Sequence, residues 1–127
     1  MNAKPVILVI DDDLPILTLM RNVLREFGFE ATVASTEAAA IESFRTKAPH
    51  LVLLDKNMPG TSVREMIAAL RKEGPNQVPI VILSGEPIER DEIQRLGAAG
   101  AVMKPFDVLD LVKRIRSHVG DAQNAAS

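Results

Sequence analysis

The sequence predicts an α/β protein, a three-layer α/β/α sandwich with a five-stranded parallel sheet in the middle layer. Short uninterrupted apolar runs, namely VILVI at 6–10, LVLL at 51–54 and IVIL at 80–83, are typical of strands buried on both faces. Segments with helical spacing separate these runs, so strands and helices alternate about five times along the chain. Strict alternation implies right-handed crossovers, which place helices on both faces of the sheet.

The first unit is the strand at 6–10, followed by a helix that begins after Asp13. Asp13 can cap this helix, and Pro15 suits its first turn. Gly28 supplies the stop. The apolar residues that fall on one face of this helix are Ile16, Met20, Val23, Leu24 and Phe27.

The second unit is a weaker strand at 30–34 and an alanine-rich helix that ends near Lys47. Either Ser35 or Thr36 can cap this helix, because both hydroxyls stand just before it. A third strand follows at 50–55.

The second half of the chain predicts three further helices, at 62–73, at 86–96 and from 108 onward. It also predicts two strands, at 78–83 and at 101–103. Gly74 and Pro75 close the first of these helices. Asp107 caps the last helix, which ends before Gly120. Residues 1–120 are therefore expected to form one domain, and the tail at 121–127 has nothing to bury and is expected to be disordered.

The composition excludes several classes of function. The chain has no cysteine, which rules out disulfides, thiolate metal sites and cysteine nucleophiles. A net charge of -2, no Trp or Tyr and only 4 Phe argue against direct binding of nucleic acid. No apolar stretch approaches the ~20 residues of a membrane span, and the N-terminus lacks the pattern of a secretion signal. We therefore expect a cytoplasmic protein that does not act at a membrane.

The apolar runs stop at polar residues that together suit phosphoryl transfer. The first run stops at Asp11 and Asp12, LVLL stops at Asp55, IVIL stops at Ser84 and AVM stops at Lys104. In an open parallel sheet the ligand crevice lies beyond the carboxyl ends of the strands, so these side chains should converge. Carboxylates, a hydroxyl and an ammonium are the groups that magnesium-dependent phosphoryl transfer requires.

The consecutive carboxylates at the end of the first strand point to a metal ion. Asp11 and Asp12 repel each other, and Mg²⁺ prefers oxygen ligands, with Mn²⁺ as an alternative ion. The alternative is that both are solvated loop residues. Asp13 is better explained as the helix cap.

Asp55 ends the most apolar run, where a plain surface carboxylate would be an unusual choice. A carboxylate in this position can attack a phosphoryl group to form an aspartyl phosphate. The reaction needs its charge neutralised, which Lys104 can do, while the Ser84 hydroxyl can donate to a phosphoryl oxygen.

Four motifs give the chain a family resemblance. LVIDDD at 8–13, LLDKNMPG at 53–60, VILSGE at 81–86 and VMKPF at 102–106 resemble the receiver domain of two-component response regulators, in this order and at similar spacing. The resemblance covers 6–119 and includes features of single-domain, chemotaxis-type receivers. It implies a (βα)5 flavodoxin-like fold with strand order 2-1-3-4-5.

The resemblance also implies roles for the site residues. Asp55 is similar to the phosphoacceptor, and Asp11 and Asp12 are similar to the metal-binding acidic pair. Asn57 would give its backbone carbonyl to the metal. Lys104 is similar to the phosphate-contacting lysine and typically precedes a cis proline. Ser84 is similar to the switch hydroxyl.

The resemblance also concerns positions that affect how long the phosphorylated state lasts and how it changes the structure. Glu86 and Asn57 occupy variable positions beside the site and either tune the phosphoryl lifetime or are plain polar loop residues. Gly85 resembles a small residue that leaves the acceptor accessible. Ala101 departs from the family pattern, which has Tyr or Phe there, so the resemblance implies an atypical switch. The stretch between Ser84 and Lys104 is also about two residues short.

The resulting prediction is a signalling protein that accepts a phosphoryl group and is not a turnover enzyme. Its donor would be a histidine kinase or a histidine phosphotransfer protein, and it would bind a downstream protein target as a monomer or as a phosphorylation-dependent dimer. One alternative is a pseudo-receiver that binds partners without phosphorylation. Another is an aspartate-nucleophile phosphatase that uses Asp11 in a D-x-D pattern with Asp13, although Pro15 does not suit that pattern.

Overall fold

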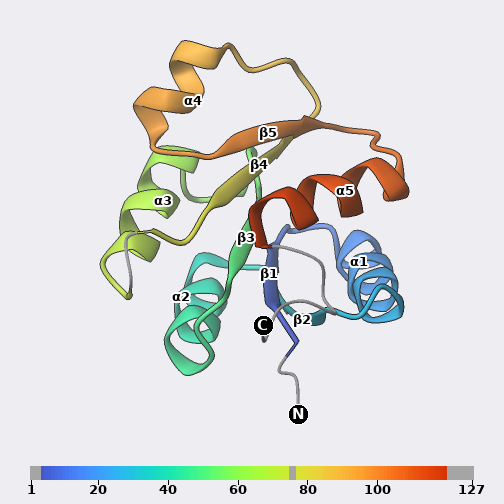
Figure 1. Ribbon diagram of the computed structural model, residues 1–127. Coiled ribbons are helices and arrows are strands. Elements are labelled where there is room, and N and C mark those ends of the chain that lie inside the picture. The colour runs from blue at the N-terminus through green and yellow to red at the C-terminus, as the bar shows by residue number, and fades with distance from the viewer. Residues whose placement is uncertain (1–3, 75–76, 120–127) are drawn as a thin grey trace.

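The computed structural model of the protein describes residues 4–74 and 77–119. Within them the chain alternates between strands and helices (Figure 1), in the order β1 (Val6–Ile10), α1 (Leu14–Glu26), β2 (Glu30–Ala34), α2 (Glu37–Thr46), β3 (Leu51–Asp55), α3 (Val63–Arg71), β4 (Ile80–Ser84), α4 (Arg90–Leu96), β5 (Gly100–Met103) and α5 (Val108–Val119). Two predicted helix stops, Pro75 and Gly120, lie outside the described residues. So does the tail at 121–127, which the sequence predicts to be disordered.

All neighbouring strands pair in parallel, in the order β2-β1-β3-β4-β5. This confirms the α/β class read from the apolar runs and the strand order that the resemblance implies. The three central strands β1, β3 and β4 are buried along their whole length, whereas the edge strands β2 and β5 are buried only in part. Uninterrupted apolar runs are therefore found where both sheet faces are covered.

Two apolar clusters lie on the two faces of the sheet. One joins the sheet to α2, α3 and α4 through residues such as Phe44, Met66 and Leu96. The other joins it to α1 and α5 through residues such as Met20 and Ile115. Figure 1 shows this arrangement, with α1 and α5 on one side of the sheet and α2 and α3 on the other. The three-layer sandwich is thus confirmed.

Side-chain caps begin α1 and α2 at residues that the sequence offers as caps. Asp13 accepts a hydrogen bond from the Ile16 backbone N–H at 3.3 Å, as its predicted role requires. Thr36, and not Ser35, caps α2. The Lys104–Pro105 peptide bond is cis, as the resemblance implies. No helix in the described part of the chain is both long and apolar enough to cross a membrane.

Two details of the helices differ from the prediction. In α1 the buried residues are Leu17, Met20 and Leu24, while Ile16 and Val23 are only partly buried, because the helix faces the sheet along the i, i+3, i+7 line.

The helix predicted over 86–96 begins only at Arg90. Ser84 holds the backbone of Glu86 in a tight turn. Pro87 also disfavours helical geometry at the residue before it. α4 is therefore short.

Candidate functional site

The polar residues that end the apolar runs meet at the carboxyl edge of the sheet. Asp11 directly follows β1, Asp55 ends β3, Ser84 ends β4 and Lys104 directly follows β5. Because the four strands are parallel and adjacent, their ends bring these residues to one edge. The convergence predicted from the sequence is present.

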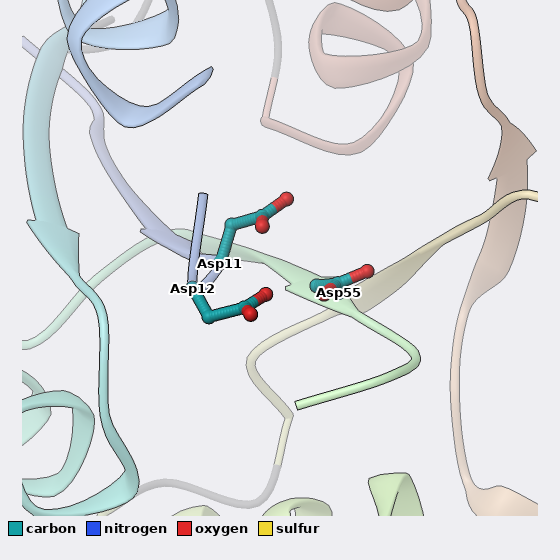
Figure 2. Close-up of side chains that lie close together, drawn as sticks. All are labelled: Asp11, Asp12 and Asp55. Carbon is teal, nitrogen blue, oxygen red and sulfur yellow. The ribbon is translucent and has the colours of Figure 1, made fainter. Parts of the chain in front are cut away.

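Three carboxylates gather at this edge. Figure 2 shows Asp11, Asp12 and Asp55 from the ends of β1 and β3, and a carboxylate oxygen of each lies within 4.8 Å of the other two. Asp11 and Asp55 are buried, with 1% and 7% of their surface exposed, whereas Asp12 is exposed. The group is therefore open to solvent on the side of Asp12.

Lys104 lies between two of these carboxylates. Its Nζ atom donates to Asp11 Oδ2 at 2.9 Å and to Asp55 Oδ1 at 3.1 Å. Burial disfavours the charged ammonium, but the hydrogen bonds and charges of Asp11 and Asp55 outweigh it and raise the pKa of Lys104. Lys104 is therefore held as a cation inside the acidic group.

One ammonium does not balance three carboxylates. Burial, together with the negative charge of Asp11, raises the pKa of Asp55, although Lys104 and the Asn57 backbone amide favour its charged form. Three negative charges against one positive charge leave a formal excess of two when all four groups are ionised. A divalent cation would neutralise that excess.

The donor set fits Mg²⁺. All three side chains offer oxygen, which is the ligand type that this ion prefers, and one or two carboxylates are enough when water and phosphate complete the octahedron. Asp11 is also positioned by the Asp13 backbone N–H, which donates to Asp11 Oδ1 at 3.0 Å. Asn57 is exposed in the loop after β3, and its carbonyl as a further ligand stays a prediction.

Ser84 is in the expected place, but its hydroxyl is engaged elsewhere. Ser84 Oγ donates to the Glu86 carbonyl at 2.7 Å and accepts from the Glu86 backbone N–H at 3.0 Å. Sequence reasoning missed this turn. The sequence contains an indication of this turn, because serine followed by glycine is typical of a turn in which the side chain bonds to the backbone.

The residues around Ser84 are small or exposed. A Cβ atom built on Gly85 would meet nothing within 4 Å, so this position is open. Ala101 is partly buried and packs against the same core cluster as Ile88. Glu86 is exposed, and its tuning role, like that of Asn57, stays a prediction.

An apolar groove adjoins the site, and sequence reasoning missed it too. It has a volume of about 380 Å³ and is lined by Ile16, Leu19, Lys104, Pro105, Phe106 and Val108. Leu14, Leu19 and Leu109 on α1 and α5 are more than half exposed. The helical periodicity of α1 locates its core face only to within one position, and it does not reveal that exposed apolar residues of the same helix border the acidic group.

Comparison with known proteins agrees with this description. The model of the response regulator receiver domain family matches residues 7–116. The probable transcriptional regulator ycf27 of Porphyra purpurea is 38% identical over 118 residues, which cover 91% of this chain and 48% of the relative. The chain thus spans about half the length of the curated relatives it matches.

Solved structures show the same fold. The chemotaxis protein CheY4 of Vibrio cholerae superposes with a TM-score of 0.85 at 25% identity, covering 91% of this chain and 99% of that one. The response regulator TrrA of Thermotoga maritima, solved in complex with Mg²⁺ and BeF, has a TM-score of 0.76 at 29% identity, covering 89% and 97%. The four motifs, the sheet order and the family match together show that the chain belongs to the receiver domain family of two-component response regulators.

Proposed function

We propose that this receiver domain accepts a phosphoryl group on Asp55 from a phosphohistidine donor. The observation that carries the proposal is the position of Asp55, which ends β3 beside two further carboxylates and bonds to Lys104. A carboxylate with a neighbouring ammonium and a divalent-cation site has the groups that aspartyl phosphate formation needs.

The transfer of the phosphoryl group to Asp55 requires no side chain of this protein to accept or donate a proton. A carboxylate oxygen of Asp55 forms a bond to phosphorus as the nitrogen–phosphorus bond of the donor breaks, and the donor histidine keeps the bonding electron pair. Lys104 stays protonated beside Asp55, since its pKa is raised, and neutralises part of the phosphoryl charge. Bound Mg²⁺ would supply the remaining positive charge.

The metal would be held by the carboxylates of Asp11, Asp12 and Asp55 together with the backbone carbonyl of Asn57. Mn²⁺ suits the same oxygen donors. Ser84 would donate to a phosphoryl oxygen.

The geometry favours Asp55 over Asp11 as the nucleophile. Both oxygens of Asp11 already accept hydrogen bonds, from the Asp13 backbone N–H and from Lys104. Asp13, the second carboxylate of a phosphatase D-x-D pattern, instead caps α1. Asp55 is also the more exposed of the two buried carboxylates.

The surroundings support a protein as the donor. The apolar groove includes Lys104 among its lining residues, so a helix seated there would lie beside Asp55. Exposed Leu14 and Leu19 extend this apolar surface along α1. A histidine kinase or a histidine phosphotransfer protein could present its phosphohistidine in this way, and a downstream protein would then read the phosphorylated state.

Labelling with a small donor tests the proposal. The protein is incubated with Mg²⁺ and acetyl phosphate, and the acyl phosphate is located by mass spectrometry. We expect a gain of one phosphoryl group on the peptide containing Asp55, lost in Asp55→Asn and retained in Asp110→Asn, which changes an exposed aspartate of α5.

Two results would contradict the proposal. Turnover of phosphoesters that depends on Asp11 would indicate a phosphatase. Absence of any mark with acetyl phosphate and with phosphoramidate would leave a pseudo-receiver that binds partners without phosphorylation.

A further inference from the structure

The loop between β3 and α3 carries a residue proposed for the metal site. Asn57 lies in this loop, two residues after Asp55, and is exposed. The Lys56 N–H donates to the Leu83 carbonyl at 2.9 Å, and the Asn57 backbone amide bonds to the Asp55 carboxylate. Met58 adds a buried contact, with 6% of its surface exposed. The first half of the loop is therefore attached to the sheet and to the core.

The second half of the loop is exposed and turns sharply. Pro59 and Gly60 are both exposed. Gly60 has a φ of +80°, in the left-handed region that favours glycine, and a Cβ atom there would meet nothing within 4 Å. An exposed stretch that contains a glycine is easily displaced unless a neighbouring residue holds it.

A hydrogen bond from the next residue ties the loop to α2. Thr61 Oγ1 donates to Glu37 Oε2 at 3.0 Å, and both residues are partly buried. The same hydroxyl lies 3.4 Å from the Ser62 carbonyl. Because a hydroxyl has one proton, the shorter bond to the charged carboxylate is the stronger of the two. We call the bond between Thr61 and Glu37 the tether.

The tether joins the segments that leave the sheet on either side of the acidic pair. Glu37 begins α2, which follows β2, whereas Thr61 follows β3. In the sheet β1 lies between these two strands, and Asp11 and Asp12 directly follow it. Glu37 also lies in the first turn of α2, where the helix N-terminus favours a carboxylate. The acceptor of the tether is therefore fixed on a helix, and the donor lies on the loop.

We propose that Glu37 and Thr61 are positioning residues for the divalent cation. The tether would hold the loop so that the Asn57 carbonyl and the Asp55 carboxylate are both available to one ion. This inference rests on the proposed function, which assigns both groups to the metal. Mg²⁺ demands nearly ideal octahedral geometry, so a ligand on a loop that must first be ordered binds it more weakly. Groups that orient metal ligands accordingly contribute to metal affinity without contacting the ion.

Calorimetric titration with MgCl₂ tests the tether. Thr61→Val removes the hydroxyl, keeps the shape of the side chain and leaves the charge of Glu37 in place. We expect the Mg²⁺ dissociation constant of this variant to rise about three- to tenfold, the equivalent of one hydrogen bond. Thr61→Ser keeps a hydroxyl and should bind Mg²⁺ as the native protein does.

Two further variants separate the tether from other causes. Thr46→Val is the matched control, because Thr46 Oγ1 donates to Glu42 Oε1 at 3.3 Å within α2 and does not contact the loop. It should leave the Mg²⁺ affinity unchanged. Glu37→Ala combined with Thr61→Val should bind Mg²⁺ no more weakly than Glu37→Ala alone, because the two residues act through one bond.

The rate of labelling by acetyl phosphate separates positioning from damage to the fold or to the nucleophile. At Mg²⁺ concentrations below the native dissociation constant, Thr61→Val should be labelled at Asp55 more slowly than the native protein. At saturating Mg²⁺ the two rates should be equal, because the bound ion then orders the loop. A deficit that persists at saturating Mg²⁺ would contradict a positioning role.

The native protein distinguishes the failure of this inference from that of the proposed function. Native Mg²⁺ affinity in Thr61→Val, with Asp55 labelled in both proteins, would overturn this inference alone. An equal loss of affinity in Thr46→Val would also overturn it, since the effect would then not depend on the loop. A native protein that neither binds Mg²⁺ nor is labelled at Asp55 would overturn both.

Discussion

Lys104 serves as the counter-cation of the acidic group in the absence of a metal. Its ammonium bonds to both buried carboxylates, Asp11 and Asp55, and it is itself only partly exposed. Removing one partner of a buried ion pair leaves uncompensated charge, which is strongly destabilising. The same lysine therefore contributes to folding and to the proposed chemistry.

Substitution of Lys104 should expose this dual role. We expect Lys104→Met, which keeps the length of the side chain, to lower the free energy of unfolding without metal by about 2 kcal/mol, less than for a fully buried pair because Lys104 reaches solvent. Saturating Mg²⁺ should stabilise the variant more than the native protein, since the ion replaces the missing charge. Urea denaturation with EDTA and with Mg²⁺ measures both values.

Lys113→Met on the exposed side of α5 is the control for this substitution. It should stay within ~0.5 kcal/mol of the native protein in both buffers. Equal effects of Mg²⁺ on the native protein and on Lys104→Met would contradict the assigned role.

At this scale the sequence predicts where residues lie better than what they bond to. Asp11, Asp55, Ser84 and Lys104 could be placed together because each follows a buried apolar run, and the ends of parallel strands share an edge. The partner of the Ser84 hydroxyl could not be read from such runs. It depends on the path of the loop after β4, which local turn chemistry determines.

At the scale of elements, hydroxyls and carboxylates before the helices proved reliable signals. The sequence leaves Ser35 and Thr36 as alternative caps of α2, because the two adjacent residues have equivalent hydroxyls. The structure resolves this, since Thr36 Oγ1 accepts from the Ala39 N–H at 3.1 Å.

The two adjacent residues form a matched pair for mutagenesis. We expect Thr36→Ala to lower the free energy of unfolding by about 1 kcal/mol, because an N–H at the helix start loses its acceptor. Ser35→Ala should change it by less than ~0.5 kcal/mol. Chemical denaturation of the two variants under one condition makes the comparison, and equal losses would show that Thr36 is not the cap that matters.

Helix boundaries were harder to predict than helix existence. The helix expected over 86–96 lacks its first four residues, because the Ser84 turn and Pro87 occupy the backbone there. The buried face of α1 was also misplaced by one position at Ile16 and Leu17. In both cases the local sequence pattern permits several helix faces or turns equally well, and tertiary contacts determine which one forms.

For the whole molecule, alternation of strands and helices was enough to predict three layers. The order β2-β1-β3-β4-β5 was not contained in that pattern, because apolar runs do not say which strand pairs with which. The resemblance to receivers supplied it.

The close packing of helices around Gly74 leads to a further prediction. Gly74 lies between α3 and β4, against the ring of Phe44 from α2. A Cβ atom at Gly74 would lie 2.7 Å from Phe44 Cε1, and that ring is 2% exposed and fixed in the core. We expect Gly74→Ala to lower the free energy of unfolding by about 1–3 kcal/mol through overpacking.

Gly85→Ala is the matched control for this substitution, because its Cβ atom would meet nothing within 4 Å. Neither glycine has a positive φ, so backbone strain affects neither variant. The urea concentration at the midpoint of unfolding should therefore be lower for Gly74→Ala than for the native protein, and nearly unchanged for Gly85→Ala. A native midpoint for Gly74→Ala would show that the Phe44 ring can move aside, and that α2 and α3 pack more loosely than the structure indicates.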